Sequence, residues 1–114
     1  MGEEEAYFYL RKLGYVMVAR NYRSSRRRGK VDLIGWEGEV LCFIEVKTRT
    51  THDLKPAEAA VNLDKQRELG GVAREYLRHL RVPPTSRFDV ISVYYDHRSG
   101  ESEMELFKNA FPVS

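Results

Sequence analysis

Two apolar runs joined by a short glycine turn constrain the fold of this chain more than any other feature. The runs are Val31–Ile34 and Leu41–Lys47. Between them, Gly38-Glu39 has the Gly-X pattern of a two-residue hairpin turn of the type II′ class. If these two residues form the turn, the register predicts that Asp32 lies opposite Glu45 in a pair of antiparallel strands.

The predicted register brings three reactive side chains to one face of the hairpin. Because side chains alternate along a strand, Asp32, Glu45 and Lys47 should project to the same side, a few ångströms apart. Two facing carboxylates repel unless a cation lies between them or one keeps its proton. This arrangement predicts a divalent metal site. The alternative is ordinary ion pairing, with Asp32 bound to Lys30 or Arg49.

The composition of the 114 residues indicates one globular domain, spanning 1–114, with 42% hydrophobic and 32% charged residues. No apolar run approaches the ~18 residues that a membrane span requires. The three glutamates near the start do not resemble the basic start of a signal peptide. We therefore expect a cytoplasmic protein without membrane association. The single cysteine, Cys42, lies in an apolar run and is expected to be buried and unbridged.

Positive charge is concentrated in one stretch, residues 20–30, which contains six of the 19 basic residues and no acid. The rest of the chain is net acidic. Clustered arginines suit the phosphates of a nucleic-acid backbone, whereas the alternative is a solvated turn. We expect nucleic-acid contact from this stretch and from the basic residue after the second run: Arg20, Arg23, Arg26, Arg27, Arg28, Lys30 and Arg49.

The remaining pattern predicts an α/β sandwich with a mixed sheet, because a long helix separates the hairpin from two later strands and permits a parallel crossover. That helix is expected to begin near Asp64 as its N-cap and to end before Pro83-Pro84. The other expected elements are a helix over Glu3–Leu13, strands over Tyr15–Arg20, Arg87–Tyr95 and Met104–Phe107, and a helical turn opened by Pro56.

The order of short motifs along the chain resembles the YraN-like family of uncharacterised bacterial proteins, a branch of the restriction-endonuclease-like, PD-(D/E)xK nuclease superfamily. The resemblance spans nearly the whole chain. Its matching segments are Gly2-Glu3, Gly14-Tyr15, Arg20–Arg23, Val31–Ile34, Phe43–Arg49, Lys65–Arg67, Arg87–Val90 and Asn109–Phe111.

The resemblance implies a restriction-endonuclease-like three-layer sandwich and a metal-dependent phosphodiesterase site. Asp32, Glu45 and the Val46 carbonyl would bind Mg²⁺ or Mn²⁺, and Lys47 would orient water and stabilise charge on the phosphate. Glu3 would add a ligand or, equally, serve the dipole of its own helix. DNA is the implied substrate, including branched repair or recombination intermediates.

One position departs from the family pattern, which usually has glutamate where this chain has Lys30. In the predicted register Lys30 lies opposite Lys47, so like charges would lower the pKa of at least one lysine and weaken cation binding. Lys30 would then either bind phosphate or reduce activity. The alternatives to a nuclease are a nucleic-acid-binding or partner-binding module without catalysis and a homodimer resembling Holliday-junction resolvases.

Overall fold

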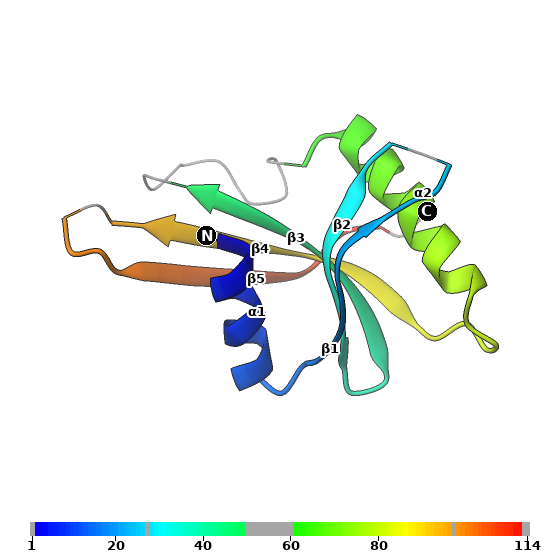
Figure 1. Ribbon diagram of the computed structural model, residues 1–114, viewed down its shortest axis with the longest axis horizontal. Coiled ribbons are helices and arrows are strands. Elements are labelled where there is room, and N and C mark those ends of the chain that lie inside the picture. Colours follow the sequence, from blue (N-terminus) through cyan, green and yellow to red (C-terminus); the bar gives the residue numbers. More distant parts are fainter. Residues whose placement is uncertain (1, 27, 50–60, 97, 113–114) are drawn as a thin grey trace.

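The computed structural model describes residues 2–26, 28–49, 61–96 and 98–112 (Figure 1). Within these ranges the chain forms two helices and five strands. In chain order they are α1 (Gly2–Lys12), β1 (Val16–Arg23), β2 (Lys30–Glu37), β3 (Val40–Arg49), α2 (Leu63–Arg78), β4 (Ser86–Tyr95) and β5 (Ser102–Phe111). The spatial order of the strands is β1-β2-β3-β4-β5, in which β3 and β4 pair in parallel and the other neighbours are antiparallel.

The helices cover opposite faces of the sheet and divide the apolar core into two layers. Leu69, Val72 and Ala73 of α2 pack against one face of the sheet. Ala6 and Leu10 of α1 pack against the other. The predicted α/β sandwich with a central mixed sheet is therefore confirmed, and it has the layers that a restriction-endonuclease-like fold requires. Among the described residues, no helix is long and apolar enough to cross a membrane.

The hairpin register is confirmed over five residue pairs, from Glu37–Val40 to Leu33–Ile44. Other boundaries differ from the prediction: β1 continues to Arg23, and β5 runs from Ser102 to Phe111. Asp64 is not the N-cap of α2; Asn62 is, and its Oδ1 accepts the Lys65 N–H at 2.9 Å. The helical turn predicted at Pro56 lies outside the described residues.

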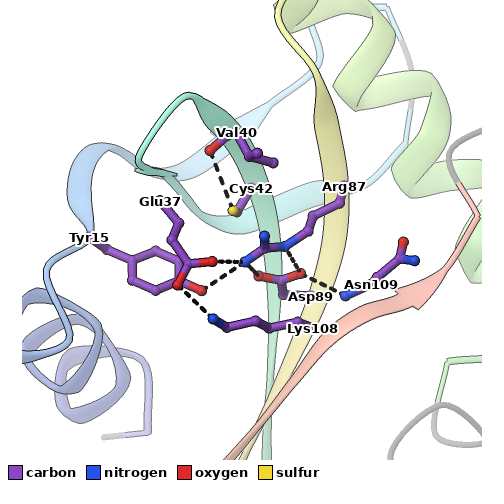
Figure 2. Close-up of polar contacts among 8 residues, drawn as sticks. All are labelled: Tyr15, Glu37, Val40, Cys42, Arg87, Asp89, Lys108 and Asn109. Atoms are coloured by element: carbon purple, nitrogen blue, oxygen red, sulfur yellow. Dashed lines mark hydrogen bonds and ion pairs between the residues drawn. The ribbon is translucent and has the colours of Figure 1, made fainter.

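A buried network of charged groups joins β4 to its neighbours at the end of the sheet where the hairpin turns (Figure 2). Asp89 is fully buried and accepts hydrogen bonds from Arg87 Nε at 2.8 Å and from the Asn109 N–H at 3.0 Å. Arg87 Nη2 also donates to Glu37 Oε1 at 2.7 Å and to the Tyr15 hydroxyl at 3.0 Å. One guanidinium therefore connects β4 with the end of β2 and with Tyr15, the residue just before β1.

Cys42 lies beside this network and is buried, as predicted. Its thiol donates to the Val40 carbonyl at 3.6 Å. Burial, and then the nearby Asp89 carboxylate, raises the pKa of the Cys42 thiol to about 12. The thiol therefore stays protonated at neutral pH and is a poor nucleophile.

Candidate metal site at the fork of two strands

The candidate site lies where β2 and β3 separate (Figure 1). Their ladder ends at Leu33–Ile44, so the predicted backbone pairs beyond it, Asp32–Glu45 included, do not form. Asp32 Oδ2 instead accepts the Val46 N–H at 2.8 Å. The Asp32 side chain thus takes the place of a backbone partner and closes the end of the ladder.

Strict alternation of side chains, on which the prediction depended, fails at Asp32. Val31 and Ile34 both pack on the α2 side of the sheet, whereas Leu33 packs on the α1 side. The interruption lies opposite Asn21, between the pairs Arg20–Leu33 and Tyr22–Val31, and Asn21 has a positive φ of 52°. This irregularity directs Asp32 into the fork, where its carboxyl group reaches the carboxyl group of Glu45.

The two carboxyl groups are buried, with 4% of Asp32 and 6% of Glu45 exposed. Burial, followed by the Asp32 carboxylate, raises the pKa of Glu45 to about 8. Burial raises the pKa of Asp32. Hydrogen bonds from Glu45 and the Val46 N–H, together with the Lys30 charge, lower it by more, so the pKa of Asp32 lies below its ordinary value. Without a cation, the pair therefore holds one shared proton near neutral pH.

One oxygen of this pair, Glu45 Oε2, is buried and has no hydrogen-bond partner among the described residues. Its contact with Lys65 Nζ, at 3.9 Å, is an ion pair and too long for a hydrogen bond. Within the same residues, no three His, Cys, Asp or Glu side chains form a group that could hold a metal ion. A cation here would thus have to combine Asp32 and Glu45 with a backbone oxygen, and the free Glu45 oxygen fits that role.

The Val46 carbonyl is positioned to supply this backbone oxygen. The N–H and C=O of a strand residue point toward the same edge of the strand. Because the Val46 N–H points to Asp32, its carbonyl also faces the fork.

Lys47 lies on β3 two residues beyond Glu45 and therefore on the same side of that strand. In the parallel ladder it pairs with Ser92 of β4. Its positive charge contributes to lowering the pKa of Glu45, although burial and Asp32 outweigh it. The structure thus brings together the three residues of the predicted catalytic set, Asp32, Glu45 and Lys47.

Lys30 does not lie opposite Lys47, in contrast to the prediction, because the ladder ends before it. Its Nζ contacts Glu3 Oε1 at 3.2 Å and Asp32 Oδ1 at 3.5 Å. Burial lowers the pKa of Lys30, but these two carboxylates raise it more, so the pKa lies above its ordinary value. Glu3 can approach because a side chain at Gly2 would collide with Thr48, so glycine lets α1 start directly on β3.

Lys65 of α2 also lies at the fork. The first turn of α2 directs its ammonium group toward the fork, 3.9 Å from Glu45 Oε2 and 3.4 Å from Glu68 Oε2. About a third of the side chain is exposed. The spacing of the helix relative to the hairpin could not reveal this contact, because it depends on how α2 crosses the sheet.

The residues predicted to bind nucleic acid separate into several positions. Arg20 lies over the Tyr7 ring, 4.6 Å from its centre, on the α1 side. Arg23, Arg26 and Arg28 are exposed, and Arg49 is half-buried at the end of β3. Arg27 lies outside the described residues. Tyr22 packs edge-on against Tyr76 at 5.1 Å, so its ring packs against the core.

Part of the basic stretch lies beside α2 (Figure 1), with contacts from Tyr22, Ser25 and Gly29. Ser25 donates from its hydroxyl group to Glu75 Oε1 at 2.8 Å. Nearer the fork, Gly29 has a φ of 100° and a side chain there would overlap Glu68. Beside Ser25, a hollow of about 280 Å³ is lined by Arg26, Glu75, Arg78 and His79 as well. Arg78 and His79 were not predicted, because their positions depend on the same helix crossing.

Comparisons with known proteins find related sequences over almost the full chain. The profile of a family described as "Uncharacterised protein family UPF0102" matches residues 2–93. A UPF0102 protein of Koribacter versatilis is 50% identical over 99% of this chain and 78% of its own length. Similar proteins occur in Solibacter usitatus, at 45% identity over 97% and 83%, and in Caldicellulosiruptor saccharolyticus, at 37% over 96% and 92%.

Proposed function

The chain belongs to the uncharacterised protein family UPF0102, and from its site we propose that it is a metal-dependent nuclease acting on DNA. The observation that carries this proposal is the buried pair Asp32 and Glu45 in the fork, with Glu45 Oε2 lacking a donor among the described residues. A buried carboxylate pair without a cation is costly. Carboxyl groups whose pKa values are strongly shifted by burial and by a nearby charge cluster at functional sites.

We propose that Asp32, Glu45 and the Val46 carbonyl hold one Mg²⁺ or Mn²⁺, since these ions prefer oxygen ligands. When bound, the ion supplies Lewis-acid polarisation of a phosphate and neutralises negative charge in the transition state. Lys47 orients the attacking water and stabilises the charge that develops on the phosphate oxygens. Asp32, fixed by the Val46 N–H, holds the geometry of the site.

The basic surface supports DNA as the substrate. Arg26 lines the hollow beside α2, Gly29 lies against Glu68 of the same helix, and Lys30 reaches the fork, whereas Arg20 lies on the α1 side. Phosphate contacts of this kind position a duplex without reading its sequence. This suits a substrate recognised by its structure, such as a branched intermediate of repair or recombination. An activity on DNA would place the protein in the cytoplasm.

A second candidate function is a DNA-binding module without turnover. The observation that favours it is the Lys30 ammonium group, which already lies against Asp32 and Glu3. A resident positive charge would weaken the hold of the site on a divalent ion. In this case the basic surface would bind DNA and the fork would remain inactive.

The proposal is tested by incubating the wild type and Asp32→Ala with linear, nicked, flapped and four-way DNA in Mn²⁺, with EDTA as the metal-free control. We expect cleavage by the wild type that EDTA and Asp32→Ala both abolish. DNA binding should survive in the variant, because the basic surface is unchanged. Preference for four-way DNA together with a dimer in solution would support the resolvase-like form.

Two outcomes would contradict the proposal. Equal cleavage by both proteins would identify a contaminating nuclease. DNA binding by the wild type without cleavage, and without Mn²⁺ binding, would support the binding module instead.

We expect the arginines of the basic stretch to set the salt dependence of DNA binding. Replacing Arg26, Arg27 and Arg28 with alanine should reduce the slope of log K against log[salt] by about 3, since each neutralised phosphate contributes about 0.9. The measurement is DNA affinity across a salt series. Arg11→Ala/Lys12→Ala is the control, because these residues lie at the end of α1 away from Glu3. An unchanged slope in the triple variant would exclude phosphate contact by this stretch.

A further inference from the structure

The Lys30 ammonium group is held by three oxygens from three different elements. Nζ lies 2.8 Å from Asn21 Oδ1 of β1, 3.2 Å from Glu3 Oε1 of α1 and 3.5 Å from Asp32 Oδ1 of β2. About a third of the Lys30 side chain is exposed. The ammonium group is therefore directed into the acidic fork, and its hydrogen bonds are made there.

The chemistry of this shell is that of a cation site. Carboxylate and amide oxygens are the ligands that hard divalent cations take. Here the same ligand types surround a compact ammonium, whose three N–H groups match three acceptors. Asn21 contributes its amide from a left-handed backbone conformation with a φ of 52°. Asparagine is one of the few residues that tolerate this conformation.

The Asp32 carboxyl group lies between two positions in the fork, one beside Lys30 and one beside Glu45. Oδ1 faces Lys30, on the side of Glu3 and Asn21. Oδ2 faces the Val46 N–H, and the Asp32 carboxyl group as a whole reaches Glu45. The position beside Glu45 contains the carboxylate oxygen that lacks a donor among the described residues. The first position thus holds an ammonium group hydrogen-bonded to its oxygens, whereas the ammonium group near the second, Lys65 Nζ, stays 3.9 Å from Glu45 Oε2 and makes no hydrogen bond to it.

We propose that the Lys30 ammonium group replaces a second divalent ion, so that the fork binds one metal ion rather than two. Phosphoryl-transfer sites with two metals place the ions about 3.5–4 Å apart, with a shared carboxylate between them. Asp32 has that bridging position, with Lys30 on one side. The inference rests on the proposed metal site at Asp32 and Glu45. It adds the number of ions and the residue that sets this number.

The test is the number of Mn²⁺ ions bound per chain, measured by titration with detection of free Mn²⁺ by electron paramagnetic resonance. We expect one ion for the wild type and one for Lys30→Arg, the control that keeps the charge. Lys30→Glu should bind two, because it removes the ammonium and adds a ligand. Lys30→Ala should also gain a second ion, with weaker affinity. Glu3→Gln in the Lys30→Glu background should return the number to one.

The outcomes separate this inference from the proposed function. One ion in the wild type and also in folded Lys30→Glu and Lys30→Ala would overturn the inference and leave the nuclease proposal intact. Two ions bound to the wild type would also overturn the inference and leave the nuclease proposal intact. A wild type that binds no Mn²⁺ would overturn both. Circular dichroism of each variant identifies a protein that has not folded, and the two substitutions at Lys30 provide independent readings.

Discussion

Arg87→Ala is expected to lower the free energy of unfolding by about 3–5 kcal/mol, because it leaves a buried charge without its partner. Asp89 is fully buried, and two of its three hydrogen bonds come from Arg87, at 2.8 and 3.2 Å. The measurement is denaturant unfolding at pH 7.

Two further variants identify the cause of this loss. Asp89→Asn in the Arg87→Ala background should recover part of the stability, since a neutral amide leaves no uncompensated charge. Lys108→Ala removes only the half-exposed ion pair with Glu37 and should cost about 0–1 kcal/mol. A loss below about 1 kcal/mol for Arg87→Ala would mean that water or a rearranged side chain satisfies Asp89.

The Arg87–Asp89 pair shows how a short motif of charged residues can stabilise a fold rather than form a reactive site. Arg87 and Asp89 are two residues apart on β4 and therefore share a face. Asp89 accepts the Asn109 N–H, and Asn109 has a positive φ of 55° where the β4–β5 register shifts. The motif thus fixes an irregularity in the neighbouring strand. The sequence contained the Arg-x-Asp spacing, but the strand that it binds is 20 residues away.

The elements that local rules govern were predictable from the sequence. The glycine turn determines the pairing of β2 with β3 as far as Leu33–Ile44. The long helix between β3 and β4 permits their parallel pairing. The errors have local causes too: Asn62 caps α2 because its side chain reaches the Lys65 N–H, whereas Asp64 lies within the first turn.

The site was predictable in its residues but not in its geometry. Asp32 and Glu45 meet, as expected, but through their side chains in a fork rather than as a pair in a ladder. The interruption depends on Asn21 in a different strand, which no pattern in the hairpin encodes. Lys30 illustrates the same limit. A register alone placed it beside Lys47, whereas the docking of α1 gives it Glu3 as a partner.

Glu45→Gln is expected to weaken Mn²⁺ binding by at least about 100-fold, because losing even a group that only supports a ligand costs about 10–100-fold. The amide has the shape of the protonated carboxyl group but cannot ionise. Wild-type affinity should rise about tenfold per pH unit up to pH about 8, since the Glu45 proton must leave before a cation binds. The variant should show no such rise. Isothermal titration with Mn²⁺ between pH 6 and 9 measures both effects.

Glu45→Gln also tests the carboxyl pair without any metal, because the stability of the metal-free wild type should itself depend on pH. The pKa of Glu45 is raised from 4.5 to about 8 in the folded state. Between these values the folded protein holds a proton that the unfolded chain has released, so wild-type stability must fall as pH rises through this window. Asp32 does not offset the fall, since its lowered pKa acts below 3.8. Glu45→Gln has no such proton, and in EDTA its stability should stay nearly constant from pH 5 to 8. Parallel stability curves for the two proteins would mean that Asp32 and Glu45 do not share a proton, and the electrostatic basis of the proposed metal site would be lost.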